Sequence, residues 1–434
     1  MTRYAALLCL TALVSPALAE GIAKPRPVTD ADYREVDEGA ARLGQLLFYD
    51  PILSGNQEVS CATCHHPRFG TGDGLSLPLG DGGRGLGPDR VADPENLPEQ
   101  RVPRNAQALF NLGAHEFTVL FHDGRIEALA DGTLRTPLDA DMVKGFDTIL
   151  SAQTMFPVLS PDEMAGHYGE NEVSSAVRRG ELTGEGGAWD LIAARVAAVP
   201  EYAAGFAEVY GLAAGEIGFT DISNAVAAFM EFEGRSDTAL FDAWLRGEAE
   251  LAGAAAEGAA LFYGEAGCAS CHAGPFLTDH DFHAMGDVQI GPGKARRFES
   301  HARDPGRFGV TGHVEDLYAF RTPSLRNVEL TAPYGHAGAF ADLGAYVAAH
   351  VGDGWAAFDP GGAVLPALEV DDLRIAESAA EVEAIRAARE TSVSLEADEV
   401  AAIVAFLKTL TDPVAVEGRL GVPERVPSGA AVAK

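Results

Sequence analysis

Basic residues are scarce in this 434-residue chain. It holds 32 lysines and arginines against 64 aspartates and glutamates, which gives a formal net charge of −32. Nucleic acids and anionic membrane surfaces bind basic proteins, so this balance excludes both as partners. A basic or neutral protein partner would be attracted, although acidity that serves solubility alone is an equal alternative.

Long apolar runs are missing too. A membrane-spanning helix needs about 20 apolar residues, and only residues 5–14 approach this composition before Ser15 and Pro16 interrupt them. This stretch follows a basic start and precedes Ala17-Leu18-Ala19, which is typical of a secretory signal cleaved after Ala19. The sequence therefore predicts a signal peptide over residues 1–19 and an exported, soluble protein without stable membrane insertion.

Cysteine is rare as well. Of five cysteines, Cys9 lies in the leader and the other four form two C-x-x-C-H motifs, at 61–65 and 268–272. In this motif two thiols attach a c-type haem and the imidazole ligates its iron. A redox dithiol or half a zinc site would not explain the histidine in both copies. We therefore predict two covalent haem c groups, which suit a periplasm, on Cys61, Cys64, His65, Cys268, Cys271 and His272.

The two motifs lie about half the chain apart, which favours two domains. Composition is that of a globular protein, with 47% hydrophobic and 22% charged residues. We expect an N-terminal haem domain over 20–240, a C-terminal haem domain over 241–412 and a flexible tail over 413–434. Apolar spacing and breakers predict an irregular loop over 70–100 and helices over 30–48, 189–196, 202–210, 221–232, 242–262, 340–351 and 399–410.

Histidine is absent between residues 67 and 103. His66 adjoins the proximal His65 and cannot easily reach the opposite face of the same iron, so this region offers the first haem no sixth ligand. In the helix predicted over 340–351, His350 shares one face with Phe340, Leu343 and Val347. His350 is therefore expected to point inward.

Seven ordered segments resemble the bacterial di-haem cytochrome c peroxidase family, which includes MauG. They are 46–51, 103–105, 123–125, 153–163, 325–328, 330–334 and 402–408. The resemblance implies a mainly α fold of two cytochrome c-like haem domains, with a peroxide-reacting N-terminal haem and an electron-transfer C-terminal haem. It also implies a calcium ion held by Asn105 and the carbonyls of Thr331 and Pro333, oxygen ligands that suit calcium; shaping of turns is the alternative.

The resemblance assigns the catalytic acid–base role to Glu163, ten residues after Gln153, as the family's distal Glu follows its Gln. Such a group moves a proton from the near to the far oxygen of peroxide. Met155, Phe156 and Met164 offer an apolar wall, and desolvation raises a carboxylate pKa. The alternative is a capping box formed by Ser160 and Glu163.

The sixth ligand of the family's second haem lies 14 residues after a histidine that corresponds to His336, and this count reaches His350. We therefore expect His272 and His350 to close the second iron, with Tyr346 as the fallback ligand and a plain core histidine as the alternative. Where the family has a relay tryptophan between the haems, this chain has His122. His122 is either an electron relay or a packing residue that bonds a propionate.

The leading hypothesis is a periplasmic di-haem c-type peroxidase that reduces hydrogen peroxide, with electrons delivered through the C-terminal haem. The donor would be a small cytochrome or cupredoxin, and a homodimer is left open. One alternative is a MauG-like enzyme that oxidises a protein side chain. It is favoured by the absence of the loop histidine that blocks the first iron in many family peroxidases, and by His350 at the position where the resemblance places a methionine ligand in the peroxidases. Another is a non-catalytic electron-transfer cytochrome, which would have two saturated haems and no need of Glu163.

Overall fold

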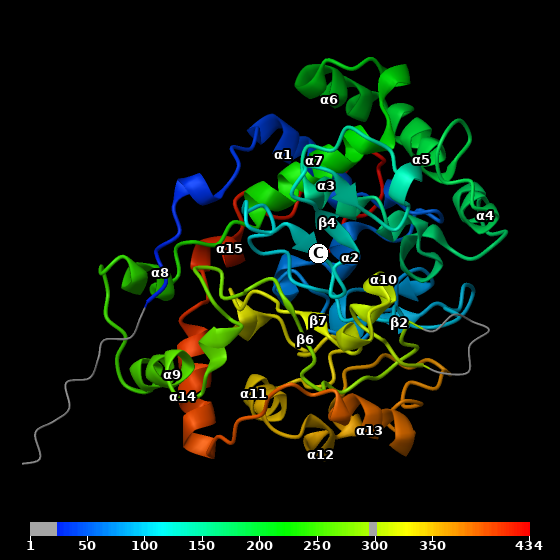
Figure 1. The fold of residues 1–434 in the computed structure, drawn as a ribbon. Coiled ribbons are helices and arrows are strands. Elements are labelled where there is room, and N and C mark those ends of the chain that lie inside the picture. The colour runs from blue at the N-terminus through cyan, green and yellow to red at the C-terminus, as the bar shows by residue number, and fades with distance from the viewer. Residues whose placement is uncertain (1–23, 295–301) are drawn as a thin grey trace, which may run out of the picture.

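The computed structural model describes residues 24–294 and 302–434. This part of the chain is mainly helical, and its few strands are two or three residues long (Figure 1). None of its helices is long and apolar enough to cross a membrane. The signal peptide predicted over 1–19 lies outside the described residues.

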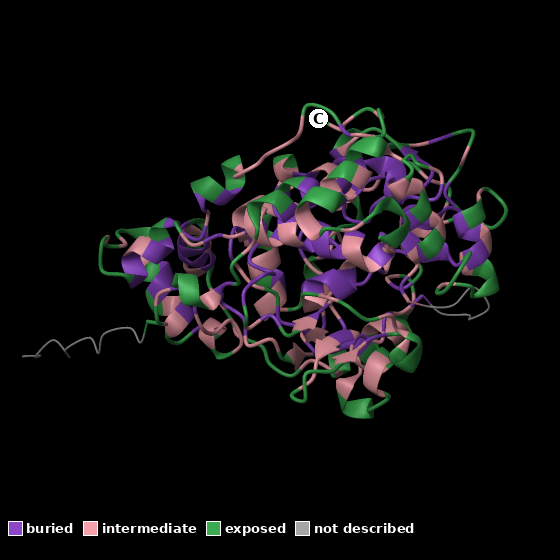
Figure 2. Cartoon of the chain, turned by 90° about the horizontal axis from the view of Figure 1, so that it is seen from above, coloured by how far each residue is buried: buried purple, intermediate pink, exposed green. Residues whose placement is uncertain are grey.

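The N-terminal half surrounds one large apolar core, visible as the buried interior in Figure 2. Its helices are α1 (Glu38–Tyr49), α2 (Cys61–Cys64), α3 (Ile149–Thr154), α4 (Glu172–Arg179), α5 (Ala188–Ala197), α6 (Pro200–Tyr210) and α7 (Phe219–Glu233). Two small antiparallel sheets lie in its loops: β1 (Gly83–Arg84) with β2 (Val91–Ala92), and β3 (Val119–Leu120), β4 (Ile126–Ala128) and β5 (Leu134–Arg135) in that order. The region 70–100 is otherwise irregular, as predicted.

The C-terminal half has its own core between α9 and α14, with smaller apolar clusters beside α11 and α13. Its helices are α8 (Leu240–Leu245), α9 (Ala254–Tyr263), α10 (Phe308–Thr311), α11 (Leu343–Val351), α12 (Gly354–Ala357), α13 (Ala379–Ala387), α14 (Ala397–Lys408) and α15 (Pro413–Glu417). The only strands described in this half, β6 (Phe282–His283) and β7 (Phe320–Arg321), pair antiparallel. Each half therefore has its own main helical core, although Phe276 packs in the N-terminal core and Leu77 in the cluster beside α11.

Both cores contain a pair of helices that cross at a glycine. A Cβ atom added to Gly44 of α1 would overlap the carbonyl oxygen of Ala225 on α7. A Cβ atom added to Gly258 of α9 would likewise overlap the carbonyl oxygen of Ala402 on α14. Only glycine lets two helix backbones approach so closely, so the same packing device holds the main helix pair of each half together.

This packing predicts the effect of Gly44→Ala. Alanine normally stabilises a helix relative to glycine by about 1 kcal/mol, but here the new methyl must separate α1 from α7. Overpacking typically costs about 1–3 kcal/mol, so we expect a lower free energy of unfolding in urea titrations. Gly215→Ala is the control, because nothing lies within 4 Å of its added Cβ. Equal stability of the two variants would contradict the prediction.

Two predicted helices differ from the structure. The first begins at Glu38 rather than Asp30, because the Asp37 side chain accepts the Ala40 amide hydrogen bond at 2.8 Å and caps the helix there. The single helix predicted over 242–262 is divided into α8 and α9. Gly247 and Gly253 have positive φ angles of 73° and 55° between them, which a helix does not accommodate.

The segment predicted as a flexible tail packs on the N-terminal core instead. Val426 is 1% exposed within that core. The backbone amides of Leu420 and Gly421 donate to the Glu233 carboxylate at 2.7 and 2.8 Å, and that of Ser428 donates to Asp50 at 3.1 Å. Apolar anchors and carboxylate acceptors more than 180 residues upstream in the sequence therefore hold residues 413–434.

Candidate active site

The first C-x-x-C-H motif forms the short helix α2, whose two middle residues are buried. Burial raises the pKa of Cys61 to about 12 and that of Cys64 further, and neither thiol is in a disulfide. His65 follows the helix, with its Nδ1 3.0 Å from the Thr71 carbonyl oxygen. Because this contact places the ring proton on Nδ1, Nε2 is the nitrogen free to bind a metal.

The second motif repeats this arrangement nearer the surface. Cys268 begins a 3₁₀ turn, Cys268–Ser270, and Cys271 directly follows it; Ser270 of this turn is exposed. His272 Nδ1 lies 3.2 Å from the Leu277 carbonyl oxygen, so Nε2 is again the free nitrogen. Burial, followed by the neighbouring His350, lowers the pKa of His272 to about 4. Both motifs thus present a neutral imidazole and two unpaired thiols, which is the donor set of a haem c.

His350 faces His272 across a gap of the size that a metal ion needs. The ring centres are 6.4 Å apart and the ring planes are inclined by 55°. Because metal–imidazole bonds are about 2.0 Å long, two rings in line on one ion have centres roughly 6.3 Å apart. The residues present therefore fit a haem iron between them, and α11 positions His350 for that role.

Glu163 lies in a single turn of π-helix, Pro161–Ala165, beside the first motif. Burial raises the pKa of its carboxyl, although the positive charges of Lys294 and Arg125 oppose the shift. Its charge in turn acts on Cys64, so the two groups share one site. Ser160 makes no side-chain capping hydrogen bond, which removes the capping-box alternative for Glu163.

The glutamine predicted to accompany Glu163 is buried at the end of α3. Gln153 is 8% exposed, and its Oε1 has no hydrogen-bond partner in the described part of the protein. Such a buried acceptor is costly unless a ligand or water satisfies it. Gly80 brings the 70–100 loop against the backbone of Glu163, since an added Cβ would lie 2.8 Å from the Glu163 Cα. The loop therefore covers the Glu163 turn.

Lys294 is a member of this site that sequence reasoning missed. Burial, then the charges of Arg125 and Arg104, lowers its pKa to about 7, while Glu163 acts in the opposite direction. Lys294 follows the second motif by 22 residues, and no local pattern connects it with Glu163. The site is therefore an acid–base pair built from both halves of the chain.

Replacing Lys294 with methionine should change the pH dependence of the reaction with peroxide. The ammonium charge lowers the pKa of Glu163, so its loss must raise that pKa. Glu163 then loses its carboxylate form at a higher pH, so the acid limb of the pH–rate profile should move to higher pH. Stopped-flow rates at acidic pH should fall several-fold while the alkaline plateau stays unchanged. The exposed Lys408→Met is the control; a downward shift of the limb would refute this assignment.

His122 lies where the two halves meet. Its backbone carbonyl accepts the Arg321 amide at 2.8 Å, and its Nε2 lies 3.1 Å from both Arg104 Nε and an Asp304 oxygen. Burial, then Arg104, lowers its pKa well below the ordinary value, so the ring is neutral. The ring centre is 5.9 Å from that of Phe320.

Phe320 connects His122 to aromatic rings of the C-terminal half. Its ring stacks on His336 with centres 4.0 Å apart and planes inclined by 16°. His336 Nδ1 in turn lies 3.9 Å from the Asp287 carboxylate. A series of rings thus runs from the junction toward His350, and sequence reasoning identified only its first member.

The residues predicted to bind calcium are brought together in part. The Asn105 backbone amide donates to the His336 carbonyl at 3.1 Å, so Asn105 lies beside the segment that contains Thr331 and Pro333. Its side-chain amide donates to the Leu75 carbonyl at 2.7 Å, which leaves the amide oxygen as the atom available to a cation. The arrangement has the oxygen donors that calcium takes.

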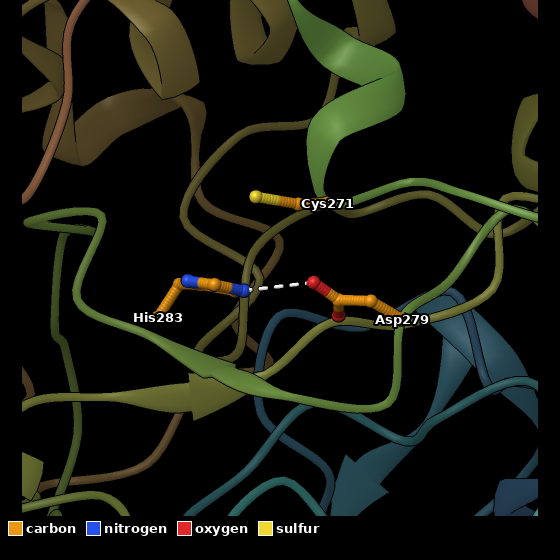
Figure 3. Close-up of side chains that lie close together, drawn as sticks. All are labelled: Cys271, Asp279 and His283. Atoms are coloured by element: carbon orange, nitrogen blue, oxygen red, sulfur yellow. Dashed lines mark hydrogen bonds and ion pairs between the residues drawn. The ribbon is translucent and has the colours of Figure 1, made fainter.

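A second cluster with metal-ligand chemistry contains Cys271, Asp279 and His283, whose donor atoms lie within 4.8 Å of one another (Figure 3). His283 Nε2 is 2.9 Å from Asp279, and its Nδ1 is 3.2 Å from Glu390. Burial lowers the pKa of His283, but hydrogen bonds from its ring to the two carboxylates outweigh burial and raise it. Because Cys271 belongs to the C-x-x-C-H motif, its sulfur is one of the thiols predicted to attach haem, and His283 and Asp279 form an ion pair.

Comparison with known proteins identifies the relatives of the chain. The profile of the di-haem cytochrome c peroxidase family matches residues 38–250. The methylamine utilization protein MauG of Methylorubrum extorquens is 30% identical over 75% of this chain and 72% of its own length. The cytochrome c551 peroxidase of Nitrosomonas europaea is 29% identical over 70% of each chain. A crystal structure of a MauG-like protein associated with microbial copper homeostasis has a TM-score of 0.60 at 27% identity, covering 93% of this chain and 98% of its own.

These relatives and the fold define the class first: the chain is an oxidoreductase of the haem-containing peroxidase type. More narrowly, it belongs to the di-haem cytochrome c peroxidase family, which includes MauG. Membership implies two haem c groups and confirms the resemblance predicted from the motifs. The fold is shared with the di-haem peroxidase BthA of Burkholderia thailandensis, with a TM-score of 0.58 at 21% identity.

Proposed function

We propose that this protein is a periplasmic di-haem c-type peroxidase that reduces hydrogen peroxide to water with electrons entering through the C-terminal haem. The observation that carries the proposal is the inequality of the two sites. The ring centres of His272 and His350 are 6.4 Å apart, which supports ligation by both, whereas the site of His65 has the buried Glu163 and Gln153.

Haem bound at Cys61, Cys64 and His65 supplies an iron that can take up peroxide, and side chains do the remaining chemistry. Glu163 as carboxylate accepts the proton of the near oxygen and returns it to the far oxygen, so that water can leave. Gln153 offers a buried amide that orients the peroxide. The 67–103 segment contains no histidine that could block the site.

The second site is suited to electron entry. His272 and His350 would both bind the iron of a haem held here, and this haem would supply electron transfer, because no position would remain for a substrate. Its attachment turn is more exposed than α2, and the chain carries a net charge of −32. A small basic cytochrome or cupredoxin fits this face, since complementary charge accelerates association.

A MauG-like reaction, in which the chain oxidises a side chain of another protein, is the second candidate. Two observations favour it: the lack of a histidine in 67–103, and the similarity to MauG over 75% of the chain. We also propose calcium at Asn105, Thr331 and Pro333, where it would brace the junction of the two halves. Metal analysis of the purified protein tests the calcium assignment.

Electron paramagnetic resonance of the resting ferric holoprotein tests the main proposal. One high-spin signal, from the first haem, and one low-spin signal, from the second, are expected, and peroxide should act on the high-spin signal without prior reduction. Two low-spin haems that react only after reduction would overturn it. Steady-state oxidation of a small reduced cytochrome would then distinguish a peroxidase from an enzyme that modifies proteins.

A further inference from the structure

Asp287 lies beside His350 and belongs to none of the motifs. It sits in the loop between β6 and the turn at 291–294, and its side chain is 17% exposed. Three donors converge on the carboxylate. Oδ1 is 3.6 Å from His350 Nδ1, and Oδ2 is 3.4 Å from Tyr346 Oη and 3.9 Å from His336 Nδ1.

Neighbouring elements hold this arrangement in place. The Trp355 indole donates to the Gly286 carbonyl at 3.0 Å and fixes the loop next to Asp287. Arg389 donates to the carbonyls of His350 and Gly352, where it holds the C-terminal end of α11. Arg389 is also the positive charge that faces Asp287 from the segment after α13. The loop and α11 are thus each fixed by a separate side chain.

The groups around the carboxylate are complementary to it. The imidazoles of His350 and His336 and the guanidinium of Arg389 face Asp287. The Tyr346 hydroxyl donates to Asp287 and also lies 3.5 Å from His350 Nδ1. Asp287 is therefore the acidic group on which the tyrosine hydroxyl and both imidazoles converge.

We propose that Asp287 is a positioning residue for the second haem: its carboxylate accepts the Nδ1–H of His350 and directs Nε2 toward the iron, while its negative charge stabilises the oxidised state. The inference rests on the proposed ligation by His272 and His350. A carboxylate bonded to a ligating imidazole fixes the tautomer and makes the ligand more basic. A more basic axial ligand stabilises ferric over ferrous iron, so the reduction potential falls.

His272 provides the internal comparison, because its Nδ1 meets the carbonyl of Leu277 rather than a carboxylate. The two axial histidines of one iron would thus have a neutral acceptor on one side and a charged acceptor on the other. Asp287 also contacts His336, which stacks on Phe320 at the junction. The residue that tunes the second haem therefore lies at the end of the series of rings that leads from His122.

The test is the midpoint potential of the second haem in the holoprotein carrying Asp287→Asn. The amide keeps the shape and an acceptor oxygen but removes the charge, so the ferric–ferrous equilibrium should shift at least tenfold toward ferrous, a rise of about 59 mV for one electron. The low-spin signal should persist with altered g-values. Asp342→Asn, which removes an equal charge at the other end of α11, should leave the potential unchanged.

An unchanged potential in Asp287→Asn, with the low-spin signal intact, would overturn the inference. If the variant fails to fold, proton NMR of the parent ferric holoprotein decides: the hyperfine-shifted Nδ1–H of His350 should exchange slowly with solvent, and rapid exchange would refute the contact. A failure of the proposed ligation by His350 is distinguishable from this result, because the low-spin signal of the second haem would then survive in His350→Ala.

Discussion

Glu163→Gln should reduce the rate of the reaction with hydrogen peroxide by about 10²–10⁴-fold, the usual contribution of a general acid–base group. Glutamine has the same shape but cannot take up or return a proton. Both haem spectra should stay as in the parent, since the change touches no proposed iron ligand. Stopped-flow mixing of the ferric protein with peroxide measures the rate.

The pH profile adds a second requirement. Because burial raises the pKa of Glu163, the parent rate should fall as the pH drops through this raised value, and the variant should lack that limb. Glu181→Gln is the matched control, because Glu181 is an exposed residue paired with Arg179 at the surface. Peroxide turnover in Glu163→Gln at the parent rate would refute the catalytic role of Glu163, whereas a parent protein without peroxide turnover would favour a plain electron-transfer cytochrome.

His350→Ala should convert the second haem from low-spin to high-spin, the largest spectroscopic change expected of any single substitution here. Removal of one imidazole leaves His272 as the remaining protein ligand, with an open position where the ring stood. Electron paramagnetic resonance of the ferric variant should show loss of the low-spin signal. Steady-state turnover with a reduced cytochrome should also fall, because electron entry depends on this haem.

Tyr346→Phe separates the two candidate ligands. Tyr346 lies one turn before His350 on α11, with its hydroxyl toward Asp287. The low-spin signal should survive Tyr346→Phe, and also the control His313→Ala, which removes an exposed histidine on another segment. A signal lost in Tyr346→Phe and kept in His350→Ala would exchange the roles of the two residues.

Helix positions were largely predictable, because they depend on local spacing and on breakers. The helices expected over 189–196, 202–210, 221–232 and 399–410 correspond to α5, α6, α7 and α14 within two residues. Two helix boundaries were missed for local reasons, the Asp37 cap and the glycines between α8 and α9. The error at the last 22 residues has a distant cause, because Glu233 and Asp50 bind the backbone of this segment.

The sequence by itself determined the net charge and the family resemblance, and it predicted the haem-attachment residues and the difference between the two haem sites, because each depends on residue type and short spacing. The two thiols and the imidazole of a C-x-x-C-H motif lie within five residues, so a single helical turn brings them together whatever the rest of the fold is. Likewise, the absence of histidine from 67–103 needs no coordinates.

Only the tertiary structure decided what surrounds each haem site. Lys294 meets Glu163 from 131 positions away, and Asp287 meets His350 from 63. Phe320 and His336 connect His122 to that pair across the junction of the halves. Contacts between such distant segments arise from the packing of separate elements, which no local spacing encodes. The positions of Lys294 and Asp287 beside Glu163 and His350 could therefore be found only in the tertiary structure.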